Sequence, residues 1–237
     1  MPLLQRTQVS IPIESMSTIS SGFAEQLRQS SISDWNACVQ HRFVDEIFAG
    51  TLDDAVLRRY LVQDYQFINR FVALLGAAIA SADVFAPRVT LSQFAAMITS
   101  DENTYFLRSF DTLGVPASER LAPQLTPQTQ AFQQLMHEAA QSLNYANCIA
   151  VLAVAEGLYL DWADQPAKQA LPLPARFEHA EWITLHANDF FRGFVAWLRS
   201  ELDRVGPSLS DAARAEATGY FQRAVQLERA FFDHVYA

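Results

Sequence analysis

The sequence predicts an all-α protein. Its 237 residues hold only 8 Gly and 10 Pro, too few for the many positive-φ turns of a β-rich fold. Apolar side chains recur every three or four residues, the spacing that buries one helix face. Because half of the residues are hydrophobic, the chain can bury one large core. We expect an N-terminal arm over residues 1–16 and a single helical domain over residues 17–237.

Capping residues divide the first half of the chain into helices. Ser33 can begin one helix and Gly50 suits its end. Asp53 places negative charge near the exposed amides of the next helix. Pro87 marks a break before a further helix, which Gly114 ends. The helices expected here span residues 17–29, 33–48, about 53–82 and about 89–113.

The second half carries similar signals. Thr126 followed by Pro127 is a typical cap and first turn of a helix. The Pro-rich residues 165–174 predict a loop, and Gly206 separates two long segments, of which Ser210 caps the second. The helices expected here span residues 127–142, 145–162, 178–205 and 210–236, which gives seven or eight helices in all.

Charge and cysteine content exclude several classes of protein. The net charge of −9 disfavours a nucleic-acid partner, which requires clustered Lys and Arg. Cys38 and Cys148 fall inside expected helices and cannot build a disulfide framework or a cysteine-rich metal site. Glu14 stands where a signal peptide needs apolar residues, and no uninterrupted apolar run reaches roughly 18 residues. We therefore expect a cytoplasmic protein without a membrane partner.

Glu156 is the strongest chemical signal. Residues 148–160, CIAVLAVAEGLYL, contain no other ionisable carboxyl or base, and Leu152 and Tyr159 share its helix face. A carboxyl buried there would have a raised pKa and could exchange protons near neutrality. Two alternatives are an ion pair with an arginine and a side chain that reaches solvent beside Gly157.

Asp64 likewise interrupts an apolar stripe, between Leu61 and Phe67. A buried aspartate can accept two hydrogen bonds from the amine and amidine edge of a ligand. The alternative is a structural ion pair with Arg70 or Arg192. The sequence does not favour either interpretation.

Glu228 is more ambiguous. It lies four residues from both Ala224 and Phe232, so it can face the core, but its polar neighbours Gln226 and Arg229 favour a solvated face. The solvated interpretation is the preferred one.

His186 shares a stripe with Trp182 and Phe190, where a histidine is more often a satisfied core residue than a ligand. None of the five histidines forms an HExxH or Glu-x-x-His pair, so no metal site is expected. The sequence also lacks a Gly-rich phosphate loop and a GxSxG elbow, which disfavours nucleotide binding and serine hydrolysis.

Short motifs follow one another from Trp35 to Tyr236. In chain order they are Trp35-x5-His41-x-Phe43, Gly50-Thr51-Leu52, Tyr60-Leu61-x-Gln63-Asp64-Tyr65-x-Phe67, Glu102-x2-Tyr105-Phe106, Asn144-Tyr145-Ala146, Glu156-x2-Tyr159-x2-Trp162, Trp182-x3-His186-x3-Phe190 and Glu228-x2-Phe231-Phe232. The ordered series resembles the TenA (thiaminase II, TENA/THI-4-like) family over nearly the whole chain. The resemblance implies a heme-oxygenase-like multi-helix bundle without heme or other cofactor, assembled as a homotetramer or dimer.

The resemblance also implies an activity. Family members release ammonia from 4-amino-5-aminomethyl-2-methylpyrimidine and give the hydroxymethylpyrimidine used in thiamin salvage. Asp64 would bind the aminopyrimidine edge, Phe67 and Tyr159 match aromatic positions of the pocket, and Glu228 matches a late catalytic carboxylate. Two substrate-binding positions where some members have Tyr are occupied by Phe132 and His186.

One departure from the family pattern concerns the nucleophile. Many members have a Cys where this sequence has Ala155, and Cys148 lies seven residues earlier, roughly 10 Å along the helix axis. The segment instead resembles a Cys-lacking branch in which two glutamates do the work. One of Glu156 and Glu228 would stay protonated and donate to the departing amine, and the other would activate water.

Two other functions remain open. A non-catalytic protein that binds a small metabolite or acts as a regulator would keep the aromatic cavity but need no converging glutamates. A metal-dependent oxidoreductase on the same fold would need His and carboxylate ligands at roughly 2.0–2.3 Å from one ion.

Overall fold

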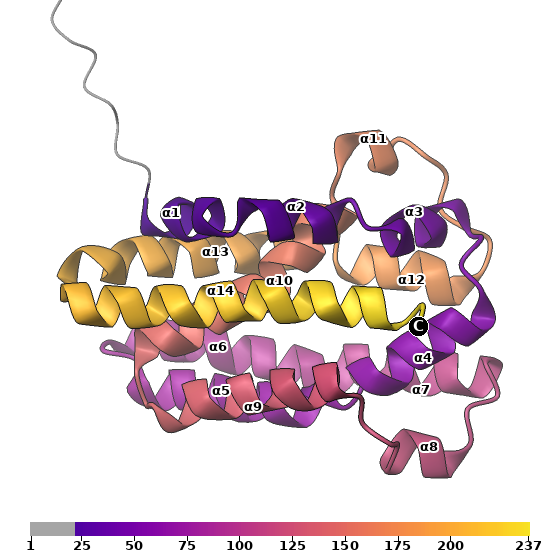
Figure 1. Ribbon diagram of the computed structural model, residues 1–237, viewed down its shortest axis with the longest axis horizontal. Coiled ribbons are helices and arrows are strands. Elements are labelled where there is room, and N and C mark those ends of the chain that lie inside the picture. The colour runs from indigo at the N-terminus through magenta and orange to yellow at the C-terminus, as the bar shows by residue number, and fades with distance from the viewer. Residues whose placement is uncertain (1–21) are drawn as a thin grey trace, which may run out of the picture.

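The computed structural model describes residues 22–237, which form helices and no strand, so the all-α prediction is confirmed for this part of the chain (Figure 1). The expected arm and the expected helix start at residue 17 lie outside the described residues. The first helices are α1 (Phe23–Ser30), α2 (Ile32–Val39), α3 (Arg42–Ala49), α4 (Asp54–Asp64), α5 (Phe67–Ser81), α6 (Phe85–Met97) and α7 (Asn103–Thr112). They are followed by α8 (Ala117–Leu121), α9 (Pro127–Gln141), α10 (Tyr145–Ala163), α11 (Pro166–Gln169), α12 (Phe177–Leu185), α13 (Asp189–Val205) and α14 (Asp211–His234).

Helix α10 forms the centre of the bundle. It contacts α14, α13, α5, α9 and α2, and Figure 1 shows α14 in front of it, α13 above, and α5 and α9 below. Every residue from Tyr145 to Val154 is buried, which explains why this segment is apolar on all sides. The helix is also long and apolar enough to cross a membrane. However, 83% of its apolar 18-residue stretch is buried inside the protein, as in a core helix.

Several expected caps are confirmed. The Thr126 side chain accepts a hydrogen bond from the Thr129 amide with Pro127 in the first turn, and Ser210 caps α14 in the same way. Gly50 ends α3 at φ 67°, a left-handed conformation that favours glycine. These helix ends could be predicted from the sequence, because a capping side chain forms its hydrogen bond with a backbone amide only a few residues away.

Three helices expected as continuous are broken. The 33–48 segment separates at His41, whose Nδ1 accepts a hydrogen bond from the Phe43 amide and begins α3. The 53–82 segment ends at Asp64 and resumes at Phe67. The 178–205 segment stops at His186 and restarts behind Asn188, which caps α13. Two of these breaks leave expected site residues at helix ends, where a side chain can turn into a cavity.

The remaining differences are small. Pro87 does not precede its helix but lies in the first turn of α6, where the missing amide hydrogen costs nothing. The helix expected over residues 89–113 is α6 and α7 joined by a π-turn at Ile98–Glu102. The short helices α8 and α11 were not expected, and α11 lies within the predicted loop of residues 165–174.

Candidate active site

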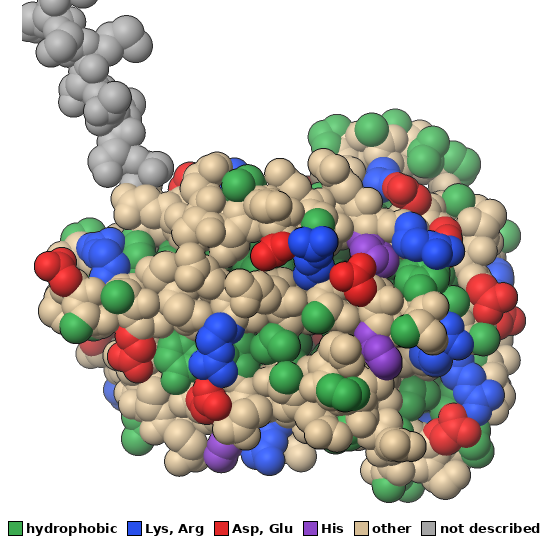
Figure 2. Space-filling view, in the orientation of Figure 1, with side chains coloured by type: hydrophobic (Ala, Val, Ile, Leu, Met, Phe, Trp, Pro, Cys, Tyr) green, Lys and Arg blue, Asp and Glu red, His purple; other side chains and the backbone are tan. Residues whose placement is uncertain are grey.

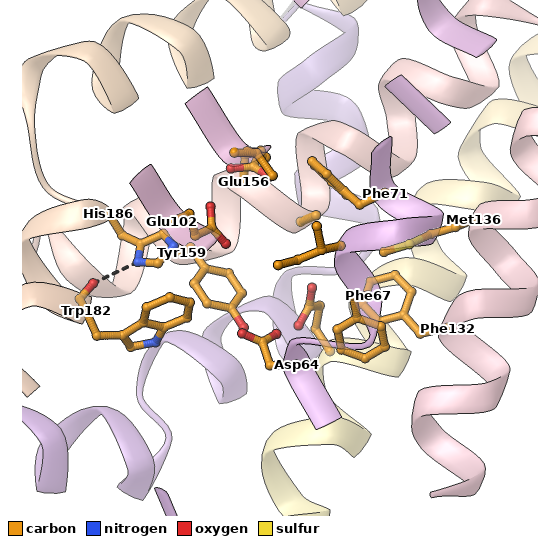
Figure 3. Close-up of a pocket in the computed structure, with 14 residues that line it drawn as sticks. Asp64, Phe67, Phe71, Glu102, Phe132, Met136, Glu156, Tyr159, Trp182 and His186 are labelled. Carbon is orange, nitrogen blue, oxygen red and sulfur yellow. Dashed lines mark hydrogen bonds between the residues drawn. The ribbon is translucent and has the colours of Figure 1, made fainter. Parts of the chain in front are cut away.

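A pocket opens among the helices that surround the middle of α10. The cavity itself holds about 70 Å³, and the empty space is about 530 Å³ when the open solvent at its mouth is included. All seven residues expected at the site line it (Figure 3). The full lining is Asp64, Phe67, Ile68, Phe71, Ile98, Glu102, Phe132, Met136, Ala155, Glu156, Tyr159, Trp182, His186 and Glu228.

The pocket has an apolar wall and a polar wall. Figure 3 shows Phe67, Phe71, Phe132 and Met136 together on one side. The rings of Phe67 and Phe132 lie 5.2 Å apart between centroids and are tilted by 60°, a favourable aromatic geometry. This wall offers a flat aromatic ligand an apolar surface.

Four carboxyl groups reach the pocket from four different elements. Asp64 ends α4, Glu102 ends the π-turn, Glu156 lies in α10 and Glu228 in α14. No hydrogen bond or ion pair within residues 22–237 engages any of these four side chains. Because unpaired charge is costly in a buried site, their protonated forms are favoured.

Burial is the main cause of the shifted acidities. It raises the pKa of Glu228, Glu156 and Asp64 well above the usual range, and the charge of Glu102 raises the pKa of Glu156 and Asp64 further. Burial alone raises the pKa of Glu102 to about 7. The pocket therefore holds protonated carboxyls at neutral pH and can both give and take protons.

The alternatives for these residues can now be judged. Arg192 pairs with Asp164 and Asp189 rather than with Asp64, and Glu156 has no arginine partner in the described chain. The preferred solvated interpretation of Glu228 is wrong, because the side chain is only 3% exposed. Its polar neighbours Gln226 and Arg229 are exposed on α14, whereas Glu228 itself lines the pocket.

His186 presents an acceptor to the pocket. Its Nδ1 lies 2.8 Å from the Trp182 carbonyl oxygen, and because a carbonyl only accepts, Nδ1 carries the proton. Burial lowers the pKa of His186 to about 4, so the ring is neutral near pH 7 and Nε2 keeps its lone pair. The expected stripe with Phe190 is wrong, since Phe190 belongs to the next helix and is 52% exposed.

Tyr159 and Trp182 surround His186 and add a hydroxyl group and an indole N–H to the polar wall of the pocket. The Tyr159 and Tyr60 hydroxyl oxygens lie 2.5 Å apart, which fixes the Tyr159 ring at the pocket edge. The His186 and Tyr159 ring centroids are 4.8 Å apart. Trp182 Nε1 is buried and has no hydrogen-bond partner within the described residues, so it is a donor without an acceptor.

No thiol lines the pocket. Ala155, the residue at which the family resemblance places a Cys in many members, lines the pocket. Cys148 is fully buried beside the Ala139 carbonyl, and burial raises the pKa of its thiol to about 12. Cys38 is fully buried as well, and burial raises the pKa of that thiol too. Neither cysteine is a thiolate near neutrality.

The metal-dependent alternative gains no support from the side chains. Within the part of the chain that the structure describes, no group of three or more His, Cys, Asp or Glu residues is arranged to hold a metal ion.

The sequence interpretation missed Glu102 as a site residue. Glu102 was expected only as part of the motif Glu102-x2-Tyr105-Phe106. A signal was present, because Glu102 continues the three-and-four spacing of the buried residues Leu91, Phe94 and Ile98. An acid at such a position is the same signal that identified Asp64 and Glu156.

Substitution Glu102→Gln is expected to stabilise the protein at alkaline pH. The pKa of Glu102 is raised from 4.5 to about 7 in the fold, so the protonated form contributes stability that is lost as the pH rises through about 7. Glutamine cannot ionise and avoids that loss. Scanning fluorimetry should give a melting temperature a few degrees above wild type at pH 8 and close to it at pH 5. An equal difference at both pH values would contradict the assigned acidity.

Comparison with known proteins gives one family. The model of the TENA/THI-4/PQQC family matches residues 29–237. Among curated proteins, an aminopyrimidine aminohydrolase of Halalkalibacterium halodurans is 25% identical over 218 residues, which cover 90% of this chain and 95% of the relative. The Bacillus subtilis aminopyrimidine aminohydrolase is also 25% identical and covers 90% of this chain and 89% of the relative.

Solved structures show the same architecture. The TenA homologue from P. horikoshii OT3 superposes with a TM-score of 0.78 at 19% identity and covers 91% of this chain and 99% of its own. A domain from Shewanella denitrificans OS217 with a heme oxygenase-like fold has a TM-score of 0.54 at 15% identity and covers 93% of both chains. The expected heme-oxygenase-like bundle is confirmed.

Proposed function

The chain belongs to the TENA/THI-4/PQQC family, and from that premise we propose that it hydrolyses a thiamin-derived aminopyrimidine. The reaction converts 4-amino-5-aminomethyl-2-methylpyrimidine and water into the hydroxymethylpyrimidine and ammonia, within thiamin salvage. The observation that carries the proposal is the set of unpaired carboxyls facing an aromatic wall in one pocket. The distant aminopyrimidine aminohydrolases support the same substrate class.

Substrate binding follows from the two walls. The pyrimidine ring packs against Phe67 and Phe132, with Tyr159 at its edge. The proton of the neutral Asp64 carboxyl moves to a ring nitrogen of the bound aminopyrimidine, and the resulting carboxylate accepts hydrogen bonds from that ring N–H and from the amino group. His186 Nε2 adds a further acceptor, so the pocket prefers a ligand rich in N–H donors.

The chemistry requires one acid and one base. A protonated carboxyl among Glu156 and Glu228 donates to the departing amine as the carbon–nitrogen bond breaks. An ionised carboxyl takes a proton from the water whose oxygen bonds to the methylene carbon. Burial of both glutamates supports the acid role, because it keeps them protonated at neutral pH.

A binding-only protein accounts less well for the pocket. Aromatic walls alone would hold a pyrimidine. Several unpaired buried carboxyls cost folding free energy, and binding of a pyrimidine ring uses only one of them. Catalysis is the usual reason why a protein retains such a destabilised site.

Cytoplasmic location and assembly as a homotetramer or dimer belong to the same proposal.

The function is tested by incubating the purified protein with the aminomethylpyrimidine in water enriched in the heavy oxygen isotope. We expect ammonia together with a hydroxymethyl product that carries one labelled oxygen, detected by mass spectrometry. If the compound raises the melting temperature but is recovered unchanged, the protein binds the ligand without hydrolysing it, and the proposal is wrong.

A further inference from the structure

We propose that Glu102 is the ionised carboxyl of this reaction, which takes the proton from the attacking water and returns it to Glu156. The inference rests on the proposed function and deepens it, because it assigns the base to a residue outside the Glu156 and Glu228 pair. Glu102 lines the same pocket as both of them.

The backbone around Glu102 supports a functional placement. Helices α6 and α7 would form one continuous helix without the π-turn at Ile98–Glu102. A π-turn inserts one extra residue, is rarely stable for its own sake and is found frequently at functional sites. Both ends of the turn, Ile98 and Glu102, line the pocket.

A structural role does not explain the side chain. Buried acids that tie elements together do so through hydrogen bonds or ion pairs, as Glu201 does with Arg204 and Tyr145. Glu102 is partly buried and has no such partner among the side chains that the structure describes. A carboxyl that faces a cavity without a partner is available to a ligand or to a water molecule.

Glu102 and Glu156 line the same pocket, where a proton can pass between them directly or through a water molecule. In the view of Figure 3, the Glu102 side chain lies between His186 and Glu156. Of the charges that act on Glu156, that of Glu102 is the strongest, ahead of Glu228 and Asp64. Glu102 is therefore the carboxyl whose charge affects the protonation of Glu156 most.

The pKa values of Glu102 and Glu156 agree with their roles as base and acid. The pKa of Glu102 is raised only to about 7, so a large fraction of this carboxyl is ionised at neutral pH. Glu156 has a pKa raised well above its usual range and remains protonated there. The two groups thus enter the reaction in the required states, one as base and one as acid.

The step balances in atoms and electrons. The proton of Glu156 moves to the amine nitrogen, which leaves with the bonding pair of the broken carbon–nitrogen bond as ammonia. The water oxygen supplies the pair for the new carbon–oxygen bond, and its proton moves to the Glu102 carboxylate. Transfer of that proton from Glu102 to Glu156 restores the starting state.

The test compares the pH dependence of ammonia release for wild type, Glu102→Gln, Glu102→Asp and Glu216→Gln. Glu216 is exposed on α14 and serves as the control. For wild type and the control we expect kcat to rise with pH through about 7, the pKa of Glu102. For Glu102→Gln, kcat should fall by about 10²-fold or more, lose this rise, and leave KM within a few-fold. The aspartate variant should retain the rise at a lower rate.

The outcomes separate the two proposals. If wild type releases no ammonia, the proposed function is wrong and this inference with it. If wild type is active and Glu102→Gln keeps both its kcat and its pH dependence, only the inference about Glu102 is wrong. The inference about Glu102 is also wrong if the rise of kcat near pH 7 disappears in Glu228→Gln instead, because that result assigns the base to Glu228.

Discussion

Substitution Glu156→Gln is expected to lower kcat for ammonia release by about 10³-fold, within the usual contribution of general acid–base catalysis. Glutamine keeps the size of the side chain, but its amide cannot give a proton to the departing amine. The fold should survive, because the wild-type carboxyl is already held neutral by burial. KM should change much less than kcat, since the proton is needed only as the bond breaks.

The measurement is steady-state ammonia release beside a melting curve for each protein. Glu216→Gln is again the control, because it changes the same residue type at an exposed position of α14. A Glu156→Gln protein that melts like wild type and turns over at the wild-type rate would remove Glu156 from the mechanism.

Substitution Asp64→Asn is expected to weaken binding of the aminopyrimidine by about 10- to 100-fold. Asparagine replaces one acceptor oxygen with an N–H donor, which faces the donor edge of the ring. Hydrogen bonds to charged groups contribute about 1.5–3 kcal/mol, and about 1.4 kcal/mol corresponds to tenfold in affinity. Isothermal titration with the hydroxymethyl product reports the change without turnover.

The control for Asp64 is Asp45→Asn. Asp45 is exposed and pairs with Lys168 on the surface, so the affinity should not change. Equal affinities for wild type and Asp64→Asn would show that the carboxyl does not contact the ring.

Local signals predicted the helices that depend on their own sequence. Thr126 with Pro127 fixed the start of α9, and Gly50 fixed the end of α3. The breaks at His41 and after Asp64 were missed, because histidine is an unusual cap and because the residues after Asp64 remain apolar. Such breaks follow from how neighbouring helices pack, which a single apolar stripe does not reveal.

The site was predictable where an acid interrupts an apolar stripe. Asp64 and Glu156 carried that signal, and Glu102 carried it too but was overlooked. Glu228 was misjudged because its sequence neighbours face solvent, although the residue itself faces the pocket. That acids from four separate elements meet in one cavity is a property of the tertiary fold, and no spacing along the chain encodes it.

We propose that the carboxyls of the pocket, without a thiol, hydrolyse the aminopyrimidine. The most direct test is ammonia release from the aminomethylpyrimidine by wild type and by the double variant Cys38→Ala, Cys148→Ala, since alanine replaces these two buried thiols with a small apolar group. We expect ammonia from both proteins at similar rates. Ammonia from wild type alone would assign the chemistry to a cysteine, and no ammonia from either protein would contradict hydrolysis itself.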